Sequence, residues 1–148
     1  MNTKKLSDKL SICEQIEPGD IAKIADMGFR SIICNRPDGE AESQPTFDQI
    51  RTVAETLEIE VRYIPVVIDS ISDQDASDFL SAVNELPGPT LAYCRSGMRS
   101  SKLWSLSQGE KSTLSVLVTG VKNASSALKN TLQQSATSSN SESGGDKR

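Results

Sequence analysis

Residues 90–106 read TLAYCRSGMRSSKLWSL, which predicts a short buried strand, a loop with one glycine and the start of a helix. Residues 90–93 supply the strand, and residues 100–106 supply the helix. A strand that runs directly into a helix is typical of α/β folds. In such folds ligands gather beyond the carboxyl ends of the parallel strands. The loop at residues 94–99 is therefore the first candidate for a functional site.

Upstream of this segment, predicted strands and helices alternate. Apolar runs bounded by turn residues predict strands at residues 10–13, 29–34 and 61–67. Apolar spacing and helix-start signals predict helices at residues 18–27, 46–57 and 73–86. This order predicts an α/β fold with a mostly parallel central sheet of about four strands and helices on both faces. Pro65 indicates a sheet edge or a strand end, because proline has no N–H for the ladder.

The chain has 148 residues, enough for one domain with a substantial core. We expect this domain to span residues 1–134, with a helical pattern over residues 109–134. Residues 135–148 read SATSSNSESGGDKR and offer almost no side chain that a core could bury. This segment is expected to be a disordered polar tail.

Charge and composition exclude several classes of function. Sixteen Lys and Arg residues against twenty Asp and Glu residues give a net charge of -4. This balance argues against a nucleic-acid or anionic-membrane partner, which would require a concentrated basic surface. No apolar run is long enough to span a bilayer, and no apolar stretch of a signal peptide follows the first lysines. We expect a cytoplasmic location, and the sequence identifies no protein partner.

The sequence contains no histidine. This excludes Ser-His-Asp triads, Cys-His dyads and histidine-ligated metal sites. The three cysteines, Cys13, Cys34 and Cys94, form no Cys-x-x-Cys pair, so neither a disulfide framework nor a zinc site is expected. Cys13 and Cys34 lie in predicted strands and are expected to be core residues. The sequence implies no metal and no cofactor.

Cys94 lies between a predicted strand and a predicted helix N-terminus, a position suited to a nucleophilic thiolate. The backbone N–H groups of residues 95–99 can point inward and bind a tetrahedral anion. Gly97 permits the backbone conformation of such a loop, and the Arg99 guanidinium can fork onto two anion oxygens. Ser100 can donate a hydrogen bond to the Cys94 sulfur. The expected anion-binding residues are Arg95, Ser96, Gly97, Met98 and Ser100.

Four stretches of the chain resemble a known family. They are EQIEPGDIAKIADMGFRSIICNRPDGE (residues 14–40), QPTF (44–47), YIPV (63–66) and LAYCRSGMRSSKLWSL (91–106). Together they resemble the phosphatase-like domain of bacterial beta-lactamase hydrolase-like proteins, a family also labelled sulfur transferase. The resemblance covers residues 10–106. It implies a protein-tyrosine/dual-specificity-phosphatase-like fold, with Cys94 as nucleophile and Arg99 as the phosphate-binding arginine.

Two features depart from ordinary phosphatases of this fold. Their loops place five residues between cysteine and arginine, whereas four separate Cys94 from Arg99, and Ser100 stands at the longer spacing. They usually carry a histidine before the cysteine, where this chain has Tyr93. The shorter spacer equals that of many rhodanese-type sulfurtransferases. A rhodanese-like fold with sulfur transfer is therefore the alternative.

A phosphatase of this kind uses a general acid to protonate the leaving group. Resemblance to the dual-specificity phosphatases places that acid on the loop after YIPV, where Asp69 stands. Asp38 is a second candidate, and for both residues the alternative is a solvated loop carboxylate. Asn35 and Arg36 follow a predicted strand end, where they either line the same site or belong to a turn.

Three functions remain open from the sequence. The first is a cysteine-dependent phosphatase-like hydrolase, in which Cys94, Arg99 and Asp69 act on a phosphomonoester. The second is a rhodanese-like sulfurtransferase that carries a Cys94 persulfide and takes sulfur from a sulfane-sulfur donor. The third is a non-catalytic anion-binding module. The first two need no metal, because the loop and Arg99 supply the positive charge.

Overall fold

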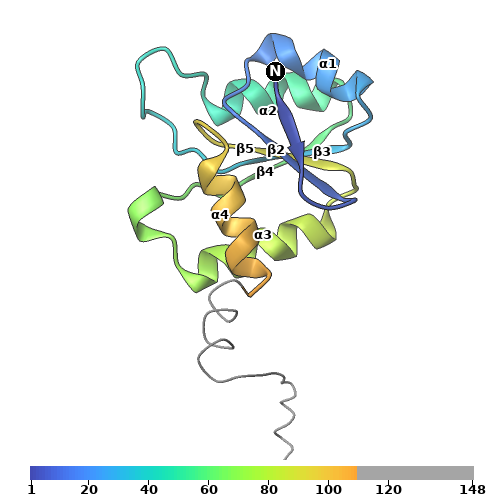
Figure 1. The fold of residues 1–148 in the computed structure, drawn as a ribbon. Helices are drawn as coiled ribbons and strands as arrows, with labels where there is room; N and C mark the ends of the chain where they lie inside the picture. The colour runs from blue at the N-terminus through green and yellow to red at the C-terminus, as the bar shows by residue number, and fades with distance from the viewer. Residues whose placement is uncertain (110–148) are drawn as a thin grey trace, which may run out of the picture. The chain divides into compact units, whose positions relative to one another are not determined.

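Five short strands form one sheet in the computed structural model, which describes residues 1–109 (Figure 1). They are β1 (Thr3–Lys5), β2 (Leu10–Cys13), β3 (Ser31–Cys34), β4 (Glu60–Tyr63) and β5 (Thr90–Tyr93). Their order across the sheet is β1-β2-β5-β3-β4. Strand β1 is antiparallel to β2, and the other neighbours are parallel. The expected helical pattern beyond residue 109 and the expected tail at residues 135–148 lie outside the described residues.

Helices separate the parallel strands. They are η1 (Pro18–Asp20), α1 (Ile21–Asp26), α2 (Phe47–Thr56), η2 (Ile68–Ser70), α3 (Asp73–Glu85) and α4 (Met98–Ser107). The predicted α/β fold with a mostly parallel central sheet is thereby confirmed. Within the part of the chain that the structure describes, no helix has the length and apolar character needed to cross a membrane.

The sheet has five strands where about four were expected, and the strand without a signal in the sequence is β1. Its three residues, Thr3–Lys5, are all exposed and show no apolar alternation. The strand forms because the outer edge of β2 offers unpaired backbone groups, which the antiparallel β1 satisfies. At the other edge lies β4, which ends at Tyr63, two residues before Pro65. The edge position indicated by this proline is confirmed.

Two of the predicted helices have different starts in the structure. The segment that begins at Pro18 opens as a 3-10 turn and becomes α-helical only at Ile21. Helix α4 begins at Met98, two residues before the predicted start. Helix α2 follows Thr46, as predicted: the Thr46 hydroxyl accepts from the backbone N–H of Gln49, whose side chain accepts from the backbone N–H of Thr46. Such a capping box satisfies two backbone donors that the helix itself leaves unpaired.

Helices cover both faces of the sheet, since successive side chains of each strand point to opposite sides. Ile33 of β3 packs in a cluster with Phe79 and Val83 of α3 and Leu103 of α4. Its neighbour Ile32 packs in a second cluster, on the side of α1 and α2. Figure 1 shows α1 and α2 on one side of the sheet and α3 and α4 on the other. Because helices close both faces, the carboxyl ends of the parallel strands are the edge left for a ligand.

Truncation of Phe79 tests the core under α3. Phe79 is fully buried, so Phe79→Ala is expected to leave a cavity and to lower the free energy of unfolding by about 3–5 kcal/mol. Ser77→Ala changes an exposed residue of the same helix and is expected to alter it by less than about 0.5 kcal/mol. Urea unfolding followed by circular dichroism measures both. Equal stability of the two variants would contradict this packing.

Candidate active site

The loops that follow β2, β3 and β5 meet at the carboxyl ends of these three neighbouring strands. In register, Tyr93 of β5 lies between Cys13 of β2 and Cys34 of β3. Beyond the strands, the backbone N–H of Gln15 donates to the Arg95 carbonyl at 3.2 Å, and that of Asn35 donates to the Tyr93 carbonyl at 2.8 Å. The strand ends therefore hold the 94–99 loop from both sides.

Cys94 follows β5 directly and is completely buried. The backbone N–H of Gly97 donates to the Cys94 sulfur, with 3.0 Å between nitrogen and sulfur. Gly97 is the N-cap of α4 and has a φ of 94°, which favours glycine. A Cβ there would make only an ordinary contact, 3.5 Å from the Cys13 carbonyl oxygen, so the positive φ is what requires glycine. The loop thus brings a backbone donor and the N-terminus of a ten-residue helix to the sulfur.

Arg99, in the first turn of α4, pairs with the carboxylate of Glu40. The Arg99 Nη1 atom lies 2.7 Å from one Glu40 oxygen, and Nη2 lies 2.8 Å from the other. Nη1 also donates to the Val66 carbonyl at 3.0 Å. The hydrogen bonds to Glu40 raise the pKa of the Arg99 guanidinium, and the charge of Cys94 adds a smaller rise in the same direction. Arg99 is thus a buried, paired cation within electrostatic reach of the Cys94 sulfur.

Glu40 also pairs with Arg36, which follows β3 and is buried. The Arg36 Nε atom lies 3.0 Å from Glu40 Oε1, and its Nη1 donates to the Gln15 side chain at 3.0 Å. Chiefly through its hydrogen bonds to Arg99, and then to Arg36, the Glu40 carboxyl has its pKa lowered from 4.5 to about 2. Glu40 is therefore ionised at neutral pH and bridges the two arginines.

Ser100 and Asn35 form a buried pair beneath the loop. The Ser100 hydroxyl donates to Asn35 Oδ1 at 2.8 Å, and the Asn35 side-chain nitrogen donates to the Ile64 carbonyl at 2.9 Å. We expected the single hydroxyl proton of Ser100 to reach the Cys94 sulfur, and here it goes to Asn35 instead. Asn35 is fully buried, so it lies within the site region and supports the loop from below.

The two acid candidates have different surroundings. Asp69 lies exposed in η2, three residues after Val66, whose carbonyl binds Arg99. The Asp38 carboxylate accepts from the backbone N–H of Phe47 at 2.8 Å, at the start of α2. The backbone N–H of Asp38 donates to the Tyr63 hydroxyl at 2.9 Å. The hydrogen bonds of Asp38 thus hold its own loop to α2 and Tyr63, whereas Asp69 lies on the loop whose Val66 carbonyl binds Arg99.

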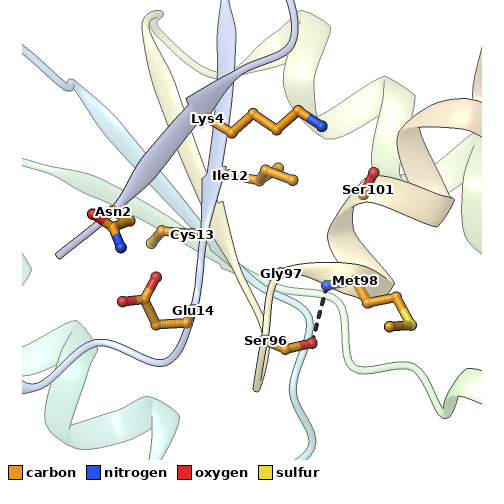
Figure 2. Close-up of a pocket in the computed structure, with 9 residues that line it drawn as sticks. All are labelled: Asn2, Lys4, Ile12, Cys13, Glu14, Ser96, Gly97, Met98 and Ser101. Atoms are coloured by element: carbon orange, nitrogen blue, oxygen red, sulfur yellow. Dashed lines mark hydrogen bonds between the residues drawn. The ribbon is translucent and has the colours of Figure 1, made fainter.

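The remaining expected anion-binding residues lie at the surface of the loop. Arg95, Ser96 and Met98 all have exposed side chains. The Ser96 hydroxyl accepts from the backbone N–H of Met98 at 3.4 Å. Ser96 and Met98 line a cavity of about 500 Å³, which is also lined by Lys4 of β1 and by Ile12 and Cys13 of β2. Figure 2 shows how these side chains lie around it. This cavity adjoins the loop on the side of the antiparallel edge strand.

Cys13 and Cys34 are buried core residues, as predicted. Burial raises the pKa of the Cys13 thiol to about 12 and that of the Cys34 thiol to about 11. The Cys34 thiol donates to the Arg36 carbonyl, with 3.3 Å between sulfur and oxygen. Tyr93, which stands where ordinary phosphatases carry histidine, packs with both cysteines on the α1–α2 side. Both thiols therefore stay protonated at neutral pH.

Sequence reasoning missed Glu40 and Gln15. Both stand within the stretch at residues 14–40, but no spacing relates either of them to residues 94–99. Only the approach of the loops after β2 and β3 to the loop after β5 brings them to Arg36 and Arg99. A carboxylate in a polar loop has no local pattern that distinguishes it from a solvated one.

The lowered pKa of Glu40 predicts a pH-dependent stability. Its ion pairs contribute in full above about pH 4.5 and are lost as the pH falls towards 2. Glu40→Gln is therefore expected to lower the free energy of unfolding by about 1 kcal/mol at pH 7 and to lose this effect near pH 2. Urea unfolding at pH 7, 4.5 and 2.5 measures the difference. Glu42→Gln is the control, and an equal effect of Glu40→Gln at all pH values would contradict the ion pairs.

Thiol labelling is expected to separate the three cysteines. At pH 7.5, iodoacetamide should alkylate Cys94 first, although all three cysteines are buried. A backbone N–H and the N-terminus of α4 lie at the Cys94 sulfur, whereas burial raises the pKa of the Cys13 and Cys34 thiols. Peptide mapping by mass spectrometry identifies the labelled residue. Sulfate is expected to slow labelling of Cys94 alone. Equal labelling of all three cysteines in the folded protein would contradict this description of the site.

The chain is similar to several known proteins. Residues 2–111 match the family described as beta-lactamase hydrolase-like protein, phosphatase-like domain. The beta-lactamase hydrolase-like protein of Xylella fastidiosa strain Temecula1 is 32% identical over 108 residues, which are 73% of this chain and 25% of that protein. The chain thus spans about a quarter of the length of the curated relatives that it matches.

Two solved structures show the same fold. A candidate phosphatase from Neisseria meningitidis z2491 is 38% identical with a TM-score of 0.69, over 73% of this chain and 77% of that one. Tk-PTP in its active form has a TM-score of 0.51 at 17% identity, over 64% of this chain and 63% of that one. The chain therefore belongs to the family of the phosphatase-like domain of beta-lactamase hydrolase-like proteins, and it has the fold of a PTP-like phosphatase.

Proposed function

We propose that this domain is a cysteine-dependent phosphatase that hydrolyses phosphomonoesters through Cys94. The observation that carries the proposal is the 3.0 Å hydrogen bond from the Gly97 backbone to the Cys94 sulfur, at the N-terminus of α4. A backbone donor and a helix N-terminus favour a thiolate over a thiol. They equally favour the phosphoryl group that a thiolate attacks. In this proposal the same backbone groups stabilise the Cys94 nucleophile and bind the phosphoryl group.

In the proposed reaction, the Cys94 thiolate attacks phosphorus, an S–P bond forms, and the bond from phosphorus to the ester oxygen breaks. Asp69 gives its proton to the departing oxygen. The Asp69 carboxylate then takes a proton from the water that cleaves the S–P bond, which releases inorganic phosphate and restores the thiolate. Arg99 and the loop amides hold the phosphoryl oxygens throughout.

Sulfur transfer is the second candidate, and the short loop favours it. Only four residues separate Cys94 from Arg99, and the Arg99 charge is already matched by Glu40. In this reaction the Cys94 thiolate attacks the outer sulfur of thiosulfate, and sulfite leaves with the electron pair of the broken S–S bond. Cyanide then takes the sulfur from the Cys94 persulfide as thiocyanate. No step requires an acid, so Asp69 distinguishes the two reactions.

Paired substrates and variants test the proposal. Cys94→Ser is expected to reduce hydrolysis of p-nitrophenyl phosphate to background. Asp69→Asn is expected to slow the hydrolysis of phenyl phosphate by about 100-fold and that of p-nitrophenyl phosphate much less. Phenol is the poorer leaving group, so its departure depends more on protonation by the acid. Asp26→Asn, an exposed change on α1, is the matched control.

The same proteins are assayed with thiosulfate and cyanide. Thiocyanate production that needs Cys94 but not Asp69, without phosphatase turnover, would replace the first function with the second. Inactivity of the folded protein in both assays, with phosphate binding retained, would leave an anion-binding module.

A further inference from the structure

The hydrogen bonds of Arg99 leave one edge of its guanidinium unused. An arginine has five N–H donors in a plane. Glu40 takes one from Nη1 and one from Nη2, and the Val66 carbonyl takes the second from Nη1. Nε–H and the second Nη2–H remain, and among the residues that the structure describes neither has an acceptor. These two lie on the same edge and form a second fork.

This orientation is held by residues outside the loop itself. Glu40 Oε1 also accepts from Arg36 Nε at 3.0 Å, and Arg36 is buried. Arg36 binds the Gln15 side chain, and the Gln15 backbone binds the Arg95 carbonyl. The chain of contacts starts at Arg95, near one end of the 94–99 loop, and returns to it at Arg99. Glu40 is the member that contacts Arg99.

We propose that Glu40 is the positioning residue for Arg99, which it holds with the Nε–H and Nη2–H edge turned to the anion in the 94–99 loop. The inference rests on the proposed anion-binding function of this loop and applies to a phosphoryl group or a sulfane-sulfur donor alike. Glu40 does not touch the substrate and acts through Arg99.

The sign of the change in anion binding distinguishes a Glu40 that positions Arg99 from a Glu40 that only places a negative charge near the anion. A carboxylate near a bound anion repels it, so removal of the Glu40 charge alone would tighten anion binding. If Glu40 positions Arg99, its removal frees the guanidinium to leave the anion, and binding weakens. The two roles therefore predict opposite signs for one substitution.

The experiment is a titration of the full chain with inorganic phosphate, followed by amide NMR shifts of the 94–99 loop. Glu40→Gln is expected to raise the dissociation constant by about tenfold, the cost of one charge-assisted contact. Glu42→Gln, an exposed neighbour with the same charge change, is expected to stay within about twofold of the wild type. Glu40→Asp keeps the charge with a shorter side chain and is expected to weaken binding too.

A double-mutant cycle shows whether Glu40 acts through Arg99. In an Arg99→Lys background, Glu40→Gln is expected not to weaken phosphate binding further, because the fork is already gone and only the repulsion by the Glu40 charge is removed. An equal loss in both backgrounds, or tighter binding by Glu40→Gln in the wild-type background, would overturn the inference. Should Glu40→Gln not fold, Glu40→Asp replaces it in the cycle. Absence of phosphate binding by the wild type would instead remove the anion site on which both proposals rest.

Discussion

The ion pair between Arg99 and Glu40 joins three loops that the chain places far apart. Glu40 follows β3, Arg99 follows β5, and the Val66 carbonyl, which Arg99 also binds, follows β4. A buried guanidinium is costly unless its charge and its donors are satisfied. Because helix α4 fixes the position of Arg99, the loops that carry Glu40 and Val66 must lie beside it. The shape of the candidate site depends on this requirement.

Three cysteines lie at the same edge of the sheet, in two different surroundings. Cys13 and Cys34 stand in register on either side of Tyr93, and burial keeps their thiols protonated. Cys94 stands one residue beyond the end of β5, in the loop, where the backbone N–H of Gly97 donates to its sulfur. The surroundings of the three sulfurs thus differ because Cys94 lies one residue beyond the end of a strand.

The spacing between Cys94 and Arg99 has a structural counterpart. With four residues between them, the next position, Ser100, turns inward and binds Asn35 beneath the loop. Arg99 lies one helical position earlier and so points to the loops after β3 and β4. The PTP-like fold is thus combined with a shorter loop, and this combination is the physical basis for weighing phosphoryl transfer against sulfur transfer. The similarity to the family establishes the fold but does not distinguish phosphoryl transfer from sulfur transfer.

Local sequence determined the regular elements and the candidate nucleophile. Apolar runs, the Thr46 cap and Gly97 act over a few residues, so the parallel strands, most helices and the strand-loop-helix around Cys94 were predictable. Strand β1 and the Ser100–Asn35 pair were not, because each depends on a partner that only the folded chain supplies. The bridge from Arg36 through Glu40 to Arg99 belongs with them. Its carboxylate gains a partner only when three strand ends come together, and no pattern along the chain carries that information.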